Sequence, residues 1–306
     1  MKLIILPLYI INLMIIPFLF MGIIRKAKAL MQNRLGASVF QPFYDFAKLL
    51  KKGETVSETA SCIFLLAPKI VLSAALIAGI LIPWSGIPAP QFLQSAANFI
   101  LIIYMLGVGK FFSMLAAMDA GSSFGGLGAS REAYISILIE PILLIGISAL
   151  ALSSGSMNMS EIFAKGFSPF VGVLCGAAFL IAALAELSRL PVDDPTTHLE
   201  LTMIHEAMIL ENSGRNLALM EYASAIRACI FLGLSAQTFL RVSPLYKNLP
   251  VLAEFIIGIA ALFIIGIFVA VVEGFIVRLN WRRVPNFIAF AAVLSILAAL
   301  VAVAKG

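Results

Sequence analysis

Charged side chains are scarce in this sequence of 306 residues, of which 12% are charged and 61% are hydrophobic. A soluble domain is typically about 25% charged and 45–50% apolar. A soluble fold of this length has too little interior to hide so much apolar surface, so the composition favours a lipid bilayer as the solvent. The formal net charge of +5 does not indicate a nucleic-acid-binding protein, because the basic residues stand in short clusters between apolar runs.

Cofactor motifs are also missing. The sequence contains no G-x-x-x-x-G-K-[ST] loop, no dinucleotide fingerprint and no H-E-x-x-H pattern. An Fe–S cluster needs about four thiolates, and the three cysteines stand far apart in or beside apolar runs, so we expect them to be small buried hydrophobes. No redox centre and no metal site are therefore expected in this chain. Any electron chemistry belongs to a partner.

Long apolar runs dominate what is present. A bilayer core needs about 20 mainly apolar residues per helix. The sequence predicts an all-α integral membrane protein with about eight spans in a single membrane domain, residues 1–306. The expected spans are residues 3–24, 60–82, 96–118, 132–153, 169–188, 217–240, 251–273 and 284–304. The first run is too long for a signal peptide and ends in basic residues, so we expect it to remain as a span.

Basic residues favour the odd-numbered loops, which predicts that these loops face the cytoplasm and that the N-terminus lies outside an inner (cytoplasmic) membrane. In loop 1, residues 40–52 alternate aromatic and basic side chains, which predicts an amphipathic helix on the membrane surface; a plain basic tether is the alternative.

Loop 5, residues 189–216, is long and acidic. Pro195 to Thr197 resembles a helix start and Ser213-Gly214 a helix stop, so we expect an amphipathic helix too short to span the membrane.

Acidic residues inside the apolar runs are the candidates for chemistry, because a carboxylate in hydrocarbon costs about 2.5–3.5 kcal/mol. Glu140 stands within the fourth run, followed by Pro141, and Glu132 lies two turns earlier, roughly 80° around the helix. Lys110, near the middle of the third run, is a plausible counter-charge for Glu140. Such carboxylates can pass protons. The alternative is that each one pairs with a Lys or Arg and stabilises helix packing.

Both histidines, His198 and His205, fall in loop 5 close to Glu200 and Glu206. Histidines seven residues apart share a helix face, but two histidines alone are weak support for a metal site. A hydrogen-bonded or proton-relaying cluster is the favoured interpretation.

Several motifs resemble the subunit 1 family of respiratory complex I. Residues 185–193 read AELSRLPVD, similar to the family's A-E-x-x-R-x-P-F-D signature. Residues 211–214 read ENSG, similar to E-Y-S-G, and Glu221-Tyr222 resembles the E-Y that follows. In loop 1, residues 32–50 are similar to the family's Q-N-R-x-G…Q-P…D…K-L-L. The resemblance covers nearly the whole chain.

One stretch discriminates between the two branches of that family. Residues 119–132 read DAGSSFGGLGASRE, which resembles the D-x-G-S-x-F-x-G-x-G-A-S-R-E of the membrane subunit of energy-converting [NiFe]-hydrogenases and formate hydrogenlyases. In loop 5, Thr196 and His198 replace two acids of the quinone-linked branch. This departure weakens the expectation of a quinone headgroup site.

The resemblance implies a membrane subunit that links electron transfer to translocation of protons or sodium ions. The expected partners are a hydrogenase-like large subunit, an Fe–S small subunit, a ferredoxin-like subunit and antiporter-like membrane subunits, with the [NiFe] and Fe–S clusters held by these partners. The residues expected on the proton path are Glu132, Glu140, Glu186, Glu200, Glu206, Glu211, Lys110, His198 and His205. Those expected to hold the loops against the peripheral arm are Arg34, Asp45, Arg131, Arg189 and Asp193. The alternatives are a quinone-site subunit of a complex I-like enzyme and a stand-alone secondary transporter, although no internal repeat supports the latter.

Overall fold

The computed structural model describes residues 2–193, 203–243, 246 and 249–305, and the regular structure of these residues is helical. Among these residues, eight helical stretches are long and apolar enough to cross a membrane, the first of which runs through α1 and α2; this confirms the predicted fold class. The elements are α1 (Lys2–Met14), α2 (Ile16–Met31), α3 (Gln41–Lys51), α4 (Cys62–Leu81), η1 (Gln91–Ala96), α5 (Phe99–Asp119), α6 (Ser123–Ser154), α7 (Met159–Lys165), α8 (Pro169–Glu186), α9 (His205–Ile209), α10 (Gly214–Val242), α11 (Val251–Phe275), η3 (Trp281–Arg283) and α12 (Val284–Lys305).

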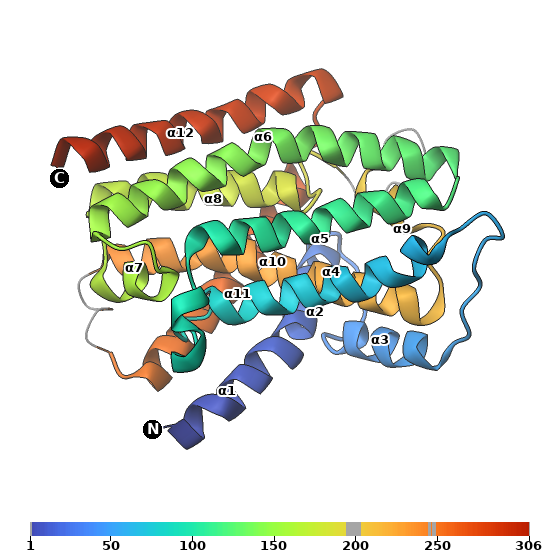
Figure 1. Ribbon diagram of the computed structural model, residues 1–306, viewed down its shortest axis with the longest axis horizontal. Coiled ribbons are helices and arrows are strands. Elements are labelled where there is room, and N and C mark those ends of the chain that lie inside the picture. The colour runs from blue at the N-terminus through green and yellow to red at the C-terminus, as the bar shows by residue number, and fades with distance from the viewer. Residues whose placement is uncertain (1, 194–202, 244–245, 247–248, 306) are drawn as a thin grey trace.

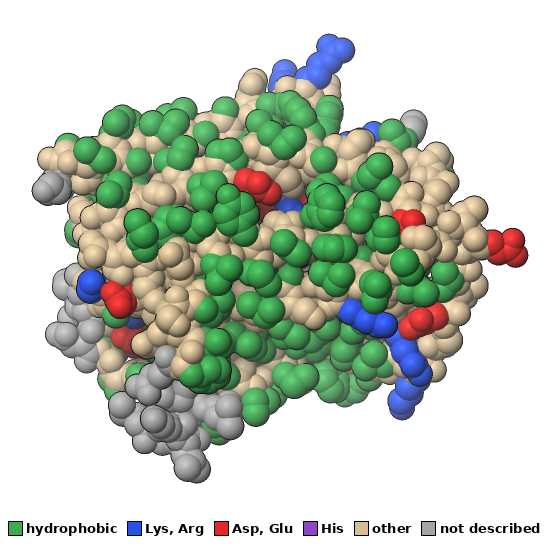
Figure 2. Space-filling model, in the orientation of Figure 1, with side chains coloured by type: hydrophobic (Ala, Val, Ile, Leu, Met, Phe, Trp, Pro, Cys, Tyr) green, Lys and Arg blue, Asp and Glu red, His purple; other side chains and the backbone are tan. Residues whose placement is uncertain are grey.

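The long helices run roughly alongside one another in an elongated bundle, with α10 at its centre (Figure 1). Helix α10 packs against α8, α4, α11, α2 and α3, and it is the most buried of the spans. The start of α1, the end of α12 and α7 lie at one end of the bundle, which we call the α7 end (Figure 1, left). Helices α3 and α9 lie at the opposite end, which we call the α9 end (Figure 1, right). Apolar side chains are spread over the face seen in Figure 2, as expected of a surface that meets lipid or membrane partners.

The first predicted span is divided between α1 and α2 at Ile15. Pro17 has no backbone N–H to donate to the carbonyl of Leu13, four residues earlier. The hydroxyl of Tyr222 on α10 donates to this carbonyl instead, at 2.8 Å. The break is therefore compensated by a side chain from the centre of the bundle, which the sequence of the first run alone does not indicate.

The motif at residues 119–132 forms the turn between α5 and α6. A carboxylate oxygen of Asp119 accepts hydrogen bonds from the backbone N–H groups of Ser61 and Phe64, at 2.8 and 3.2 Å, and so caps the start of α4. Ser122 caps α6 by accepting from the N–H of Gly125 at 3.1 Å. Helix α6 therefore begins about nine residues before the predicted span and reaches 32 residues.

A non-helical segment, residues 82–90, is buried between α4 and η1 and was not anticipated from the sequence. Residues 82–87 and 89 are buried, and residues 88 and 90 are partly buried. The indole of Trp84 donates to the carbonyl of Gly79 at 3.0 Å, and the backbone N–H of Ala89 donates to the hydroxyl of Ser160 at 2.9 Å. The irregular backbone is therefore held by partners on α4 and α7.

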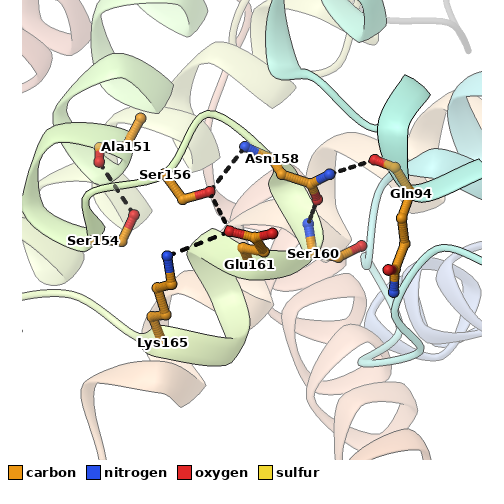
Figure 3. Close-up of polar contacts among 8 residues, drawn as sticks. All are labelled: Gln94, Ala151, Ser154, Ser156, Asn158, Ser160, Glu161 and Lys165. Atoms are coloured by element: carbon orange, nitrogen blue, oxygen red, sulfur yellow. Dashed lines mark hydrogen bonds and ion pairs between the residues drawn. The ribbon is translucent and has the colours of Figure 1, made fainter. Parts of the chain in front are cut away.

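Polar side chains around α7 form a hydrogen-bonded group (Figure 3). The hydroxyl of Ser156 donates to Glu161 at 2.8 Å, and Asn158 caps α7 by accepting from the N–H of Ser160 at 3.0 Å. The hydrogen bond from Ser156 holds the pKa of the exposed Glu161 carboxyl below its usual value. The amide of Asn158 also donates to the carbonyl of Gln94 in η1, which ties α7 to the loop after α4.

Two elements lie in the loops at the α9 end. Helix α3 (Gln41–Lys51) forms where residues 40–52 alternate aromatic and basic side chains; its position at a membrane surface stays a prediction. In loop 5, the expected amphipathic helix from about residue 195 to residue 213 is wrong over its described part, because only His205–Ile209 is helical there. Residues 203 and 204 are not helical, and the expected start at Pro195 to Thr197 lies outside the described residues.

Candidate functional site

The centre of the candidate site is an ionic cluster inside the bundle near the α9 end. The ammonium of Lys110 on α5 contacts Glu186 on α8 at 2.6 Å and Glu132 on α6 at 3.3 Å, and all three side chains are at most 6% exposed. It also donates to the hydroxyl of Ser136 at 2.7 Å. The second carboxylate oxygen of Glu132 has no hydrogen-bond partner among the described residues. Three helices thus meet at one buried cation, and one carboxylate keeps a free acceptor.

A small cavity adjoins this cluster. It is lined by Glu132, Glu186, Leu187, His205, Ser224 and Arg227, which bring α6, α8, α9 and α10 together. About 10 Å³ of it is open to the centre of a water molecule, which is close to the space that a single water needs. The carboxylates of the ionic cluster and His205 of loop 5 therefore line one common space.

His205 lies at the loop-5 side of this cavity, in the first turn of α9. Burial lowers the pKa of its imidazole to about 4, and the positive charge of Arg227 lowers it in the same direction. The imidazole is therefore neutral at pH 7, with one nitrogen that donates and one that accepts a hydrogen bond. A neutral imidazole suits a hydrogen-bonded relay better than a fixed cationic partner for the carboxylates.

Glu140 lies apart from the cluster. It is on α6 like Glu132, but it is exposed on the outside of the bundle, whereas Glu132 is 4% exposed. The two carboxylates therefore do not line one environment, and the expected pair between Lys110 and Glu140 is wrong because the ammonium is occupied by Glu132 and Glu186. Gly107 on α5 lies close by: a Cβ atom there would be 3.8 Å from the Glu140 carboxylate. Gly107 and Lys110 are three residues apart, so they share one side of α5.

A second buried ionic group is centred on Glu273 of α11, an acid near the end of the seventh apolar run. Its side chain is completely buried and contacts Arg189 at 3.2 Å and Lys28 of α2 at 3.5 Å. Arg189 was expected to hold the loops against the peripheral arm; in this chain it binds Glu273 of α11, and its role toward a partner stays a prediction. The three charges join α2, the end of α8 and α11 near the α9 end.

The start of loop 5, directly after α8, contacts a later part of loop 5 and the loop between α11 and α12. Asp193 accepts a hydrogen bond from the N–H of Ile204 at 3.0 Å and contacts Arg278 at 3.4 Å. Arg131 of α6 donates to the carbonyl of Met203 at 3.1 Å and lies over the ring of Trp281 at 5.9 Å. Both residues therefore fix the folded part of loop 5 inside this chain. Their expected role toward a peripheral partner stays a prediction.

The remaining predicted residues are dispersed. Arg34 is exposed, and Asp45 on α3 lies 3.9 Å from Arg25 with both side chains substantially exposed. Glu206 is half-buried on α9, and Glu211 is exposed just after it. His198 and Glu200 lie outside the described residues.

Arg227, Lys28 and Arg278 are the cationic partners that the sequence reasoning left out of the site. Arg227 stands well inside the sixth apolar run and is 8% exposed, so the rule that selected Glu140 and Lys110 also selects it. Lys28 and Arg278 follow their spans within a few residues, where a lysine or arginine usually reaches the lipid surface. No local signal in the sequence distinguishes these two from ordinary anchors.

A second small cavity lies between α2, α3 and α10. It is lined by Phe18, Met21, Arg25, Pro42, Phe46, Glu221, Tyr222 and Ala225, and about 30 Å³ is open to the centre of a water molecule. The rings of Phe18 and Tyr222 are stacked with centroids 4.9 Å apart, and Phe46 packs against both. This space is about a tenth of the smallest typical ligand pocket, which holds about 300 Å³.

Comparison with known proteins agrees with this architecture. The chain is similar to hydrogenase-4 component C of Escherichia coli (strain K12), with 33% identity over 235 residues, covering 76% of this chain and 73% of the relative. Formate hydrogenlyase subunit 4 of the same organism is 28% identical over 91% of this chain and 93% of its own length. The H subunit of the NADH-quinone oxidoreductase of Wolbachia pipientis wMel is 31% identical over 84% of each chain.

A solved structure has the same fold. A chain of the membrane-bound sulfane sulfur reductase, an archaeal respiratory membrane complex, matches 98% of this chain with a TM-score of 0.75 and 24% identity. The family model described as NADH dehydrogenase matches residues 3–304. The resemblance to subunit 1 of complex I, with relatives in hydrogenase complexes, is therefore confirmed. This chain, matched over residues 3–304, belongs to the NADH dehydrogenase family.

Proposed function

We propose that this chain is the membrane coupling subunit of a multisubunit, energy-converting hydrogenase-like oxidoreductase. In this role it docks the redox subunits at the α9 end and converts their electron transfer into translocation of protons or sodium ions. The relatives named as a hydrogenase-4 component and a formate hydrogenlyase subunit support the hydrogenase branch. The [NiFe] and Fe–S clusters are assigned to partner subunits.

The observation that carries the proposal is the buried cluster of Lys110, Glu132 and Glu186 with its cavity toward His205. Charges inside a membrane bundle are costly and are usually retained for ion pathways. A structural ion pair needs one carboxylate for one ammonium. Here two carboxylates share the ammonium and one of their oxygens has no hydrogen-bond partner, so the group can accept a proton without first breaking the pair.

We infer that the α9 end faces the cytoplasm and meets the peripheral arm. This end carries the basic residues of loop 1 and loop 7, and positive residues favour the cytoplasmic side. Changes in a docked redox subunit reach the ionic cluster through loop 5, since Asp193 and Arg131 hold that loop next to α9. Both chain ends would then lie on the other side of an inner membrane.

Glu140 is proposed to pass the ion to a membrane partner. A carboxylate exposed on the side of a spanning helix is unfavourable in lipid, so we expect an antiporter-like subunit to cover it in the assembled complex. Exposed apolar residues surround it on α5 and α6, including Tyr104 at 68% and Ile137 at 70% exposure. A partner helix that meets this face would bury the carboxylate and continue the ion path.

The test is Glu140→Gln in the complete complex reconstituted in liposomes. Substrate-driven ion uptake should be abolished, because glutamine cannot bind and release a proton, while hydrogen or ferredoxin turnover on the soluble side persists. Glu161→Gln is the matched control, since Glu161 is an exposed carboxylate outside the spans. Full ion uptake by the Glu140 variant would remove this residue from the path.

A quinone-site subunit is the second candidate, and the cavity beside Phe18, Tyr222 and Glu221 favours it. The cavity is apolar with two charged residues, but it must widen about tenfold to reach the size of a typical ligand pocket. Co-purifying quinone, or inhibition by quinone-site blockers that is lost in Phe18→Trp, would favour this candidate over the hydrogenase type.

A further inference from the structure

The buried 82–90 segment lies deeper than an ordinary connecting loop. On α11, Gly258 faces Ser85, and it is seven residues, or about 10 Å, inside the start of that helix. On α10, Gly233 faces Trp84, and it is nine residues, or about 14 Å, inside the end of that helix. Helices α10 and α11 are 29 and 25 residues long, so each extends beyond a hydrocarbon core that is about 30 Å thick. If each helix is centred on the core, the segment reaches about 7 Å into it.

Glycines allow this close approach. A Cβ atom on Gly258 would overlap the carbonyl of Ser85 and lie 2.5 Å from the side-chain amide of Gln237. A Cβ atom on Gly233 would lie 2.7 Å from the carbonyl of Trp84. Two spanning helices thus close directly onto the backbone of the segment, so no side chain of either helix separates them from it at these points.

An ion pair locks the two helices over the segment. Arg241 of α10 contacts Glu254 of α11 at 3.0 Å, with side chains 6% and 13% exposed. The guanidinium also lies over the ring of Tyr246 at 4.8 Å. The hydroxyl of Tyr246 donates to the backbone carbonyl of Glu254 at 2.9 Å, next to Gly86. Tyr246, between α10 and α11, thereby joins Arg241 and the start of α11 beside the buried segment.

This group is separated from the ionic cluster near α9. Along α10, Arg227 and Ser235 are eight residues, or about 12 Å, apart, and residues 228–234 between them are all apolar and buried. On α8, residues 177–185 between Gly176 and Glu186 are apolar as well. Neither helix offers a polar step from one end of the bundle to the other.

Irregular backbone at membrane depth is stable only if protein buries it or if it lines a water-filled path. The burial of residues 82–87, the close glycine contacts and the apolar stretch of α10 favour the first case. We propose that the 82–90 segment is a re-entrant plug, locked by the Arg241–Glu254 pair, that seals the α7 end of this subunit against ions. Ions that reach Lys110 from the α9 end then leave sideways rather than straight through the chain. The plug itself does not depend on the coupling role proposed above.

Passive proton leak tests the plug. The assembled complex is reconstituted in liposomes without substrate, a potassium diffusion potential is imposed, and proton entry is followed with an internal pH dye. Gly258→Ala, which displaces Ser85, and Glu254→Gln, which breaks the ion pair, should each increase the leak several-fold while electron transfer by the redox subunits is unchanged. Gly126→Ala is the matched control, because a Cβ atom on Gly126 meets open space. Assembled variants as tight as the native complex would overturn the proposal.

A second outcome of the same experiment would also overturn it. If Glu254→Gln lowers substrate-driven ion uptake while the passive leak stays native, the group around Glu254 is part of a path and not a seal. An accessibility measurement covers the case in which the variants fail to assemble. Ser85→Cys in a Cys62→Ser background should resist a membrane-impermeant maleimide added from either side. Labelling of that cysteine in the otherwise native complex would show that water reaches the segment.

Discussion

Replacing Lys110 with methionine removes the ammonium that contacts both Glu186 and Glu132, at 2.6 and 3.3 Å. At an effective dielectric constant of about 20, each contact corresponds to roughly 5–6 kcal/mol of Coulomb energy before desolvation is subtracted. Measured losses from deleting one partner of a buried pair are about 3–5 kcal/mol, because the remaining charge stays buried and unpaired. We expect Lys110→Met to destabilise the subunit by a value in this range.

The double variant Lys110→Met, Glu186→Gln should recover about 1–3 kcal/mol of that loss, because one unpaired carboxylate disappears with the ammonium. The assay is a double-variant cycle on the purified complex, with unfolding free energies from titration with a denaturing detergent. Lys165→Met is the control: Lys165 is an exposed lysine of α7 outside the spans, and its surface pair with Glu161 contributes little, so its replacement should change stability by no more than about 0.5 kcal/mol. A cost below about 1 kcal/mol for Lys110→Met, with no recovery in the double variant, would refute the assignment of a shared cation.

Three further expectations follow from single contacts. Asp119→Ala removes the carboxylate that accepts from the N–H groups of Ser61 and Phe64 at the start of α4, and it should lower stability by about 0.5–2 kcal/mol in the same titration. Asp119→Asn, which keeps one acceptor oxygen, should lose less stability. Tyr222→Phe leaves the carbonyl of Leu13 without a donor and should cost about 1–3 kcal/mol, with no change in helix content by circular dichroism. The packed His205 has a pKa of about 4, against an ordinary value of about 6.5. Below pH 6.5, His205 is protonated when loop 5 opens but stays neutral while α9 is packed, so acid favours the open state. Protection of α9 from hydrogen exchange should therefore fall between pH 6.5 and 4, and His205→Gln should remove this pH dependence.

The sequence determined the class of the molecule. Eight apolar runs of about 20 residues predict spanning helices, because lipid offers no hydrogen-bond partner and a helix satisfies its own backbone N–H and C=O groups. The same rule marked Lys110, Glu140 and Glu186 as exceptional, because any charge inside such a run stands out. The loop-5 motif and the motif at residues 119–132 indicate the family from the sequence alone.

Tertiary structure alone decided which charges meet. Lys110 and Glu186 are 76 residues apart, and their contact depends on how α5 and α8 pack, which helical periodicity within one run does not encode. For the same reason Glu132 is inside the bundle while Glu140, on the same helix, is outside. The buried 82–90 segment contains no charge, and its Pro and Gly residues are typical of any loop. Its depth is set by Gly233 and Gly258, which lie far from it in the sequence, on α10 and α11. Only a residue without a side chain lets a helix pack this closely against another backbone.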